Sequence, residues 1–540
     1  MKNSSRPSQQ GVLCEDALRE DLGFSAALLS GGDHRINIDP KTQLNIYGCS
    51  PGPRRQALQF SSSTASSISL RGLRAASAEY QLLLPAIGER NLLEIIDGRY
   101  TEFRTELASL LGVPNLDADI VFTPSGTDSQ LIALFIAACM LAEDVATVIV
   151  ASDQTGRGSL NAAAGQNFSE VTAKGVTVEK GRQVSRLFPS GYGIQIAIID
   201  EEGNVLSDEL IHQRIVESIE KLIRRGKKVV VHAMDCSKLG CRSPSSAVIA
   251  EITKKYQGMA QVIVDGCQAR LSGARIQWYL DQGCLIVVTG SKFYTGPPFS
   301  GAVLVRKGGV STVSARPEIL ERLVDYTCKV DWPQGCDGIR DALPATFNVG
   351  QLLRWAAALE EMRTYFAVPL YVRRKLLRDF CGTMERLIDQ TSGLKRLRLP
   401  RRNVDSEIDQ EMSDYTIFSF FIAEAGRYMS MEEATKVYQW LNMDVRDLLV
   451  RRTMIGDSDL GESICHIGQP VRVAYEPGKT AGALRISVDA RLVYECWSKE
   501  GKRVDEARYR QVCGDVERVL KKVVLLAQNF VELCQLTICV

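Results

Sequence analysis

The chain has 540 residues, of which 45% are hydrophobic and 24% are charged, and its 65 lysines and arginines nearly balance 64 aspartates and glutamates. This composition is typical of a folded protein, and a net charge of +1 excludes the overall basic field that recruits nucleic acid or anionic membrane. The longest apolar run, 131–142, is shorter than the ~18 residues of a membrane span, so we predict a buried helix there and no membrane partner.

Residues 1–90 are rich in serine, glycine and arginine, as in 60-FSSSTASSISLRG-72. We expect an irregular, solvated N-terminal arm with a few short helices. The first ten residues lack the apolar run of a signal peptide, which favours a cytoplasmic location.

From residue 91 onward, short β-branched runs alternate with amphipathic segments of helix length. The predicted strands are 119–123, 147–151, 195–200, 228–234, 261–265 and the two runs on either side of Lys292. The predicted helices are 91–112, a helix from Ser129, 208–226 and 246–257. This alternation predicts an α/β domain with a mostly parallel sheet between two layers of helices.

The pattern changes after Pro344, where long helical segments at 351–366 and 370–390 precede a few strands and two closing amphipathic segments. We therefore predict a smaller C-terminal α+β domain. The predicted division is an N-terminal arm at 1–90, a large α/β domain at 91–345 and a small domain at 346–540.

Cysteine and histidine usage indicates a reduced protein without a metal centre. The 15 cysteines include no C-x-x-C pair, which favours free thiols over a disulfide framework. The four histidines have no metal-ligand spacing, so we predict no zinc site.

A short polar turn follows the first predicted strand of the large domain. Its Ser125, Gly126 and Thr127 combine hydroxyl groups with a tight turn at a helix start, where free N–H groups bind phosphate well. An ordinary helix N-cap explains the same residues equally well.

Three charged residues lie in or at the ends of other apolar strands. Asp265 ends a strand that reads as fully buried, so its carboxylate needs a cation or a donor, unless it only caps the next turn. Lys292 follows a second buried strand, at the edge of the sheet where α/β proteins bind ligands. Arg485 lies within a strand pattern of the small domain and suits a carboxylate ligand or a structural ion pair.

Together, a phosphate loop, a strand-end aspartate, a strand-end lysine and a late arginine are the groups that pyridoxal 5′-phosphate (PLP) chemistry needs. The chain resembles the fold type I PLP enzymes (the aspartate aminotransferase superfamily), and within them the class V aminotransferase and cysteine desulfurase branch. The motifs that carry the resemblance are SGT at 125–127, VDGCQ at 264–268 and TGSKFYTGPP at 289–298, and it spans roughly 95–490. It implies PLP fold type I, a seven-stranded type of sheet and a homodimer with shared active sites.

The resemblance also implies a role for each matching residue. Lys292 would form the Schiff base with PLP, Asp265 would bind the pyridine nitrogen, and Arg485 would bind the substrate carboxylate. Further cofactor contacts would come from Ser125, Gly126, Thr127, Ser237, Gln268 and Ser291. Thr346 would reach the phosphate of the neighbouring subunit. Where the family stacks a histidine or an aromatic ring on the cofactor, this chain has Thr155 or Gln154, which leaves the reaction type open.

The first interpretation of the reaction is an aminotransferase acting on an amino acid or related amine, because that reaction needs only Lys292 as proton shuttle and Arg485 as carboxylate clamp. A C–S lyase of the cysteine desulfurase kind, or a decarboxylase, is the alternative. A desulfurase needs a mobile cysteine, and Cys465 has a suggestive position, but the strand-like run around it favours a buried, inert thiol. His466 is expected to be a partly buried, hydrogen-bonded side chain, or else an acid or base that acts through a residue of the site. A non-catalytic PLP-fold binding protein is the remote alternative.

Overall fold

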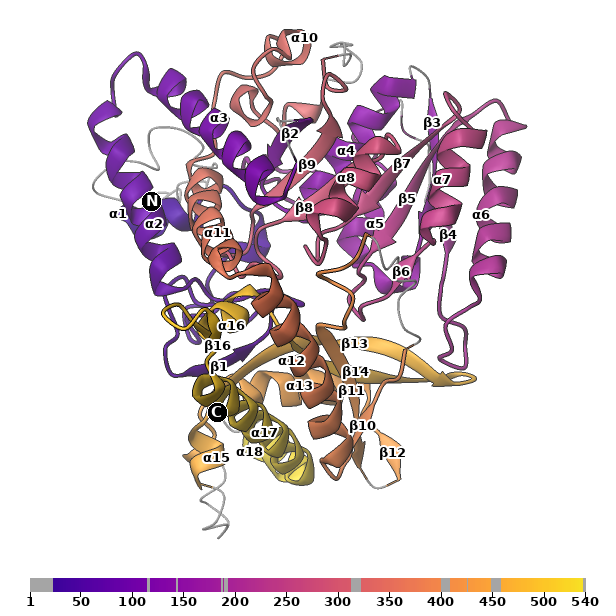
Figure 1. Cartoon of the computed structure of the whole chain (residues 1–540). Coiled ribbons are helices and arrows are strands. Elements are labelled where there is room, and N and C mark those ends of the chain that lie inside the picture. The colour runs from indigo at the N-terminus through magenta and orange to yellow at the C-terminus, as the bar shows by residue number, and fades with distance from the viewer. Residues whose placement is uncertain are drawn as a thin grey trace, which may run out of the picture.

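The computed structural model of the chain is shown in Figure 1. It describes residues 23–113, 117–141, 144–185, 188, 193–311, 322–399, 408–424, 426–447 and 458–537. The first 22 residues of the predicted arm thus lie outside the described residues. No helix within the described ranges is long and apolar enough to cross a membrane.

The large domain is built on one eight-stranded sheet. Its main order is β2 (Ala118–Thr123), β9 (Gly301–Arg306), β8 (Leu285–Thr289), β7 (Ala260–Asp265), β5 (Lys228–Asp235), β3 (Val145–Val150) and β4 (Ile194–Ile196), while β6 (Arg242–Ser243) joins β5 outside this order. β9 runs antiparallel to both of its neighbours, and the other strands of the main order share one direction. The prediction of a mostly parallel sheet is confirmed.

The strands of this sheet are apolar on both faces because both faces are covered by helices. Val230 and Ile263 belong to the cluster under α4 (Gly126–Leu141). Val229, Val231 and Val262 belong to the opposite cluster, which is covered by α6 (Asp208–Ile223), α7 (Ser246–Lys255) and α8 (Gly273–Asp281). Full burial of such a side chain contributes about 1.5–3 kcal/mol, so the alternating side chains fix the register of each strand.

The C-terminal part forms a separate, smaller sheet below the first one (Figure 1). Its order is β1 (Ala57–Phe60), β13 (Ile464–Glu476), β14 (Lys479–Ser487), β11 (Ile417–Glu424) and β10 (Leu394–Arg396), with β12 (Arg427–Tyr428) on β11. Helices α12 (Leu370–Gln390), α13 (Met431–Leu441) and α17 (Glu506–Gln528) pack against it. The predicted α+β character is confirmed.

The remaining helices connect and cover these layers. α11 (Val349–Ala367) packs against α2 (Leu70–Leu83) and α3 (Leu92–Leu110). The shorter elements are α1 (Gly23–Leu29), α5 (Arg157–Ala163), α10 (Asp337–Arg340), α15 (Ser458–Glu462), α16 (Ala490–Glu495), α18 (Phe530–Thr537), β15 (Trp497–Ser498) and β16 (Arg503–Val504), together with single 3₁₀ turns such as η2 (His34–Ile36).

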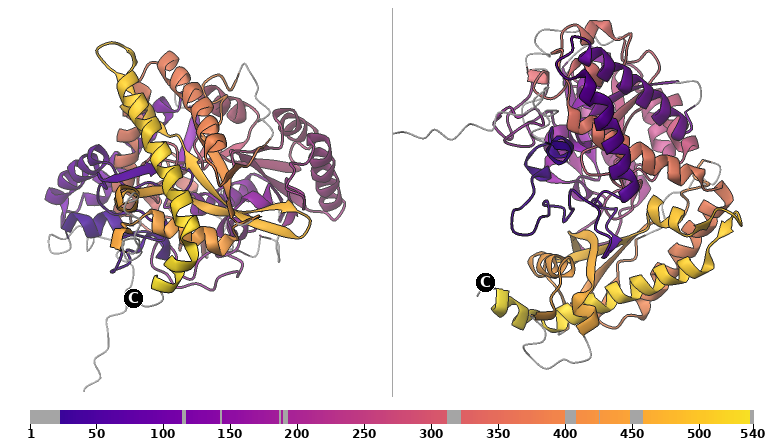
Figure 2. Two further views of the ribbon diagram at one scale, coloured as in Figure 1. Left: turned by 90° about the horizontal axis from the view of Figure 1, so that it is seen from below. Right: turned by 90° about the vertical axis from the view of Figure 1, so that its left-hand side faces the viewer.

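The N-terminal segment is not the solvated arm that its composition predicts. β1 pairs in parallel with β13, so this part of the chain lies against the small domain (Figure 2). The serine- and threonine-rich residues 61–67 that follow β1 are all buried. The expectation of solvation is wrong for them because their polar groups bond to buried side chains. The N–H of Ser63 donates to Ser487 of β14, and Gln268 and Arg270, which follow β7, donate to the carbonyl of Ser63 and the hydroxyl of Ser62. The exact domain boundaries stay a prediction.

Candidate active site

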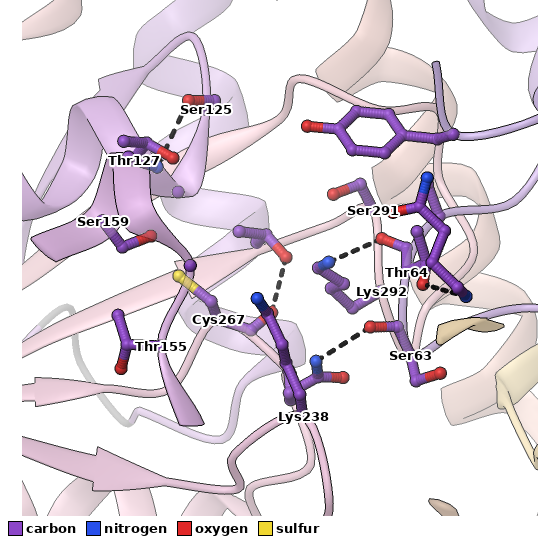
Figure 3. A pocket seen from close by; sticks show the side chains of 18 of the residues that line it. Ser63, Thr64, Ser125, Thr127, Thr155, Ser159, Lys238, Cys267, Ser291 and Lys292 are labelled. Atoms are coloured by element: carbon purple, nitrogen blue, oxygen red, sulfur yellow. Dashed lines mark hydrogen bonds between the residues drawn. The ribbon is translucent and has the colours of Figure 1, made fainter. Parts of the chain in front are cut away.

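A cavity of about 400 Å³ lies at the carboxyl ends of β2, β3, β5, β7 and β8, and Figure 3 shows it from close by. Parallel strands of an α/β sheet present these ends at one edge, which is where such folds bind ligands. The predicted site residues that line the cavity are Ser125, Gly126, Thr127, Thr155, Ser237, Asp265, Gln268, Ser291, Lys292 and Arg485. The structure therefore brings together residues that are 360 positions apart in the sequence, from 125 to 485.

Lys292 lies at the centre of this set, on the loop that follows β8. Its Nζ donates a hydrogen bond to the carbonyl oxygen of Thr64, at 2.5 Å. Burial, together with the positive charges of Arg485 and Lys238, lowers the pKa of Lys292 to about 7. Its amine is therefore largely uncharged just above neutral pH, which is the form that attacks a carbonyl carbon.

Asp265 lies at the end of β7, and its Oδ1 accepts a hydrogen bond from the backbone N–H of Cys267 at 3.0 Å. Burial raises the pKa of Asp265, whereas the Cys267 contact and Lys292 favour its charged form. A carboxylate in this position is stabilised by a cationic ligand atom. Gln268, three residues on, is held by donating to the carbonyl of Ser63 at 3.0 Å and accepting from Arg270 at 2.8 Å.

The turn after β2 has both of the properties that its sequence predicts. Ser125 Oγ accepts from the backbone N–H groups of Thr127 at 3.2 Å and Asp128 at 3.3 Å, so Ser125 caps α4. The same turn faces the cavity, where the N–H of Gly126 and the side-chain hydroxyl groups of Ser125 and Thr127 can bind an anion. Gly126 is required there, because a Cβ atom would lie 2.6 Å from Cys267 Sγ.

An arginine from the N-terminal segment lies on this cradle. Arg35 donates to Thr127 Oγ1 at 3.0 Å and to Ser125 Oγ at 3.2 Å, and it pairs with Asp33 at 2.6 Å. Burial alone would lower the pKa of Arg35, but Tyr47 and Asp33 outweigh it and raise the pKa. The cradle thus has a guanidinium group beside it, whose charge is shared with Asp33.

Arg485 of β14 is buried, at 2% exposure, and faces the other side of the cavity. It donates to the carbonyl of Gln469 at 2.9 Å, to Thr64 Oγ1 at 2.9 Å and to the carbonyl of Lys238 at 3.2 Å. Burial lowers its pKa to about 9, so it stays cationic at neutral pH. No carboxylate of the described residues pairs with it, which leaves its charge available to an anionic ligand.

Three predicted residues have contacts that bear on their roles. Ser237 Oγ accepts from the backbone N–H groups of Leu239 at 3.2 Å and Cys241 at 3.1 Å, so it shapes the loop after β5. Thr155 lines the cavity and donates to the carbonyl of Ala151 at 3.1 Å. Thr346 does not line the cavity, and its hydroxyl contacts Cys328 Sγ at 3.3 Å. Its predicted contact is with a second subunit and stays a prediction.

Cys465 and His466 lie on β13 and do not line the cavity. Cys465 is fully buried, and burial raises its pKa to about 11, so it is an unreactive thiol as its strand-like surroundings predict. His466 Nε2 donates to the carbonyl of Tyr47 at 2.9 Å, and burial lowers its pKa to about 4. It is therefore a buried histidine, as predicted, with one ring nitrogen bonded and Nδ1 without a hydrogen-bond partner among the described residues.

Sequence reasoning missed Arg35 and Tyr47 of the N-terminal segment, and Lys238. Arg35, Tyr47, Ser63 and Thr64 all line the cavity, as does Lys238 on the loop after β5. The run of serines and threonines after Phe60 was the available signal, since a polar run directly after an apolar strand needs partners if it is buried.

No protein-family model and no curated protein matches the chain. Among solved structures, it is similar to a NifS-like protein (16% identity, TM-score 0.47, over 86% of this chain and 98% of that one). It is also similar to mouse CSAD, with 14% identity and a TM-score of 0.47 over 85% of this chain and 83% of that one. A third similar structure is the cysteine desulfurase CsdA from Escherichia coli, with 15% identity and a TM-score of 0.48 over 86% of this chain and 95% of that one. At these identities and TM-scores, the likeness concerns the course of the chain and does not extend to substrate or reaction.

Proposed function

We propose that this protein is a PLP-dependent enzyme that acts at the amino group and α-carbon of an amino acid or related amine, as an aminotransferase. The observation that carries the proposal is the convergence of four groups on one cavity: the Lys292 amine, the Asp265 carboxylate, the Ser125–Thr127 helix start and the Arg485 guanidinium. PLP has an aldehyde, a basic ring nitrogen and a phosphate, and the cavity offers a partner to each.

The residues present fit this cofactor. Lys292 would hold the aldehyde carbon covalently, Asp265 would bind the protonated ring nitrogen, and Gln268 would face the ring oxygen. The phosphate would be held by Ser125, Gly126, Thr127 and Ser291. The positive charge of Arg35 supports an anion at the same end. We further propose a cytoplasmic homodimer in which Thr346 contacts the partner's cofactor.

When bound, PLP supplies an electron sink for the bonds at the substrate α-carbon. The chain supplies the rest of an aminotransferase reaction. Arg485 would orient the substrate by its carboxylate. Lys292, with a pKa of about 7, would take a proton at the α-carbon and return it, since a base works best with a pKa near the operating pH. The buried surroundings of both residues limit access of water to these steps.

A desulfurase lacks support here because Cys465 is buried in β13 and has a raised pKa. The remaining alternatives are a decarboxylase, another lyase and a non-catalytic binding protein. The product of the reaction, or its absence, distinguishes each of them from an aminotransferase. Purified protein mixed with PLP and a panel of amino acids should yield keto acid, rather than CO₂ or sulfide. If the spectrum of the bound cofactor responds to no amino acid, the amino-acid substrate is wrong.

The central test is covalent attachment. The protein should become yellow with PLP, and borohydride should abolish the visible absorption and fix the cofactor to one peptide. Mass spectrometry should find the modification on Lys292. Modification of another lysine, with Lys292 unlabelled, would contradict the assignment.

Cofactor uptake should depend on pH through Lys292. Because the uncharged amine reacts and its pKa is about 7, the initial rate of uptake by cofactor-free protein should rise about tenfold per pH unit below that value and level off above it. Stopped-flow absorbance measures this rate. Pyridoxal lacks the phosphate and should give the same inflection. This control excludes titration of the phosphate as the cause of the pH dependence. A rate that still rises steeply at pH 9 would mean that the lysine has its ordinary pKa.

Arg35→Met should weaken binding of PLP by about 10- to 100-fold, because a charge-assisted hydrogen bond contributes about 1.5–3 kcal/mol. Equilibrium dialysis measures the dissociation constant. Binding of pyridoxal should be unchanged, since it has no phosphate for Arg35 to contact. In Arg35→Met the carboxylate of Asp33 loses its partner. The double variant Asp33→Asn/Arg35→Met removes that unpaired charge as well. Equal losses for PLP and pyridoxal would show that Arg35 acts on the fold and not on the phosphate.

A further inference from the structure

Two lysines that line the cavity are not used by the proposed chemistry: the exposed Lys180, and Lys238. Lys292 is assigned to the cofactor aldehyde and Arg485 to the substrate carboxylate. Lys238, on the loop after β5, also lines the cavity and points into it (Figure 3). The proposed function gives this residue no role.

The loop of Lys238 is held in a fixed shape. Ser237 accepts hydrogen bonds from two backbone N–H groups of the same turn, and Arg485 donates to the carbonyl of Lys238 at 3.2 Å. A Cβ atom on Gly156 would lie 3.2 Å from Lys238 Nζ, so the glycine leaves room for the ammonium group beside the loop after β3. Both neighbouring loops therefore direct this amine into the cavity.

Within the described part of the chain, the ammonium group is left without a partner. Lys238 Nζ makes no hydrogen bond and no ion pair with any described residue. Burial and the nearby Arg485 lower its pKa to about 8, while Asp265 acts in the opposite direction. Lys238 is half-buried. A cation that is partly withdrawn from water without a partner is costly, and a ligand anion relieves that cost.

We infer that Lys238 and Arg485 together form a subsite for two acid groups, so that the substrates are amino acids with an anionic side chain. Arg485 binds the α-carboxylate, and Lys238 binds the acid group of the side chain, be it a carboxylate, a sulfinate or a sulfonate. This inference rests on the proposed function for the role of Arg485, and it adds the substrate class.

The test uses pairs of ligands that differ in one acid group. Succinate and butyrate have four carbons each, as glutarate and pentanoate have five, and none of them reacts. Calorimetry with the cofactor-loaded protein should give at least about tenfold tighter binding for the diacid of each pair. Lys238→Met should remove this preference, and Lys238→Arg should retain part of it. The exposed Lys180, which also lines the cavity, is the matched control, and Lys180→Met should keep the preference.

Amino-acid substrates give an independent readout. For Lys238→Met, kcat/KM should fall for aspartate, glutamate and cysteine sulfinate, mainly through KM, and stay near that of the unaltered protein for alanine and 2-aminobutyrate. Equal affinity for succinate and butyrate in the unaltered protein overturns the inference, as does a preference that survives in Lys238→Met. A changed cofactor spectrum without any ligand, with the preference intact, assigns Lys238 to the cofactor ring and overturns it also.

Failure of the inference is distinguishable from failure of the proposed function. If PLP is not bound covalently, the function is wrong, and the diacid preference is still measurable on the cofactor-free chain. If PLP is bound but diacids have no advantage, only the inference is wrong. Circular dichroism checks that Lys238→Met is folded, and Lys238→Gln provides a second variant of similar size.

Discussion

Lys292→Ala is expected to abolish covalent retention of PLP and to lower turnover by about 10²- to 10⁴-fold or more. The variant loses both the amine that would hold the cofactor and the base that would move the proton at the α-carbon. Neighbouring side chains do not replace it, because Lys238 is held on a different loop by the contacts around Ser237.

Two measurements check this expectation: the borohydride-sensitive absorption of the dialysed protein, and the rate of keto-acid formation. Lys180→Ala removes an exposed lysine of the same cavity and should leave both unchanged. Added methylamine should restore part of the rate to Lys292→Ala if a missing amine is the cause. A variant that keeps the absorption band and full turnover would refute the assignment.

Asp409→Ala is expected to destabilise the fold by about 3–5 kcal/mol, because it leaves two buried arginines without their shared carboxylate. Asp409 accepts from Arg242 at 2.6 and 3.1 Å and from Arg275 at 2.6 and 2.9 Å. The exposed fractions of these three side chains are 1%, 2% and 0%. Urea unfolding at neutral pH should therefore begin at a clearly lower concentration.

The control is Asp379→Ala, which breaks an ion pair with Lys375 on the surface of α12 and should cost less than about 1 kcal/mol. Although burial opposes ionisation, Arg275 and Arg242 lower the pKa of Asp409 to about 2 from its ordinary 3.8. This carboxylate therefore contributes stability above pH 4, and the contribution is lost as the pH falls toward 2. Asp409→Ala should lack that acid-dependent part. Similar unfolding curves for the two variants would contradict the buried network.

The central sheet was predictable because most of its strands are β-branched runs, several of which end at a polar residue, as β7 does at Asp265. The position of Asp265 and Lys292 follows from the same rule, since parallel strands end at one edge. Helix starts were less predictable. α4 begins at Gly126, three residues before the predicted Ser129, because Ser125 caps it. The nine-residue helix α8 was missed because its pattern is too short to be told from a loop.

The N-terminal contributions to the site were not predictable from local pattern. Thr64 contacts Lys292 across 228 positions and Arg485 across 421. Arg35 contacts Ser125 across 90. The polar run after Phe60 indicates at most that the segment needs partners if it is buried, and it does not identify them. Serine-rich composition by itself favours a solvated segment. Only tertiary contacts bury this N-terminal segment.

The parallel pairing of β1 with β13 has a consequence for synthesis of the protein. Ala57 lies opposite Ile464 in that pair. β1 therefore cannot pair until β13, some four hundred residues later in the sequence, has been synthesised. Contacts between residues that are so far apart in the sequence form slowly. Because Arg485 of β14 lines the cavity, the pocket is complete only after β14 has been synthesised.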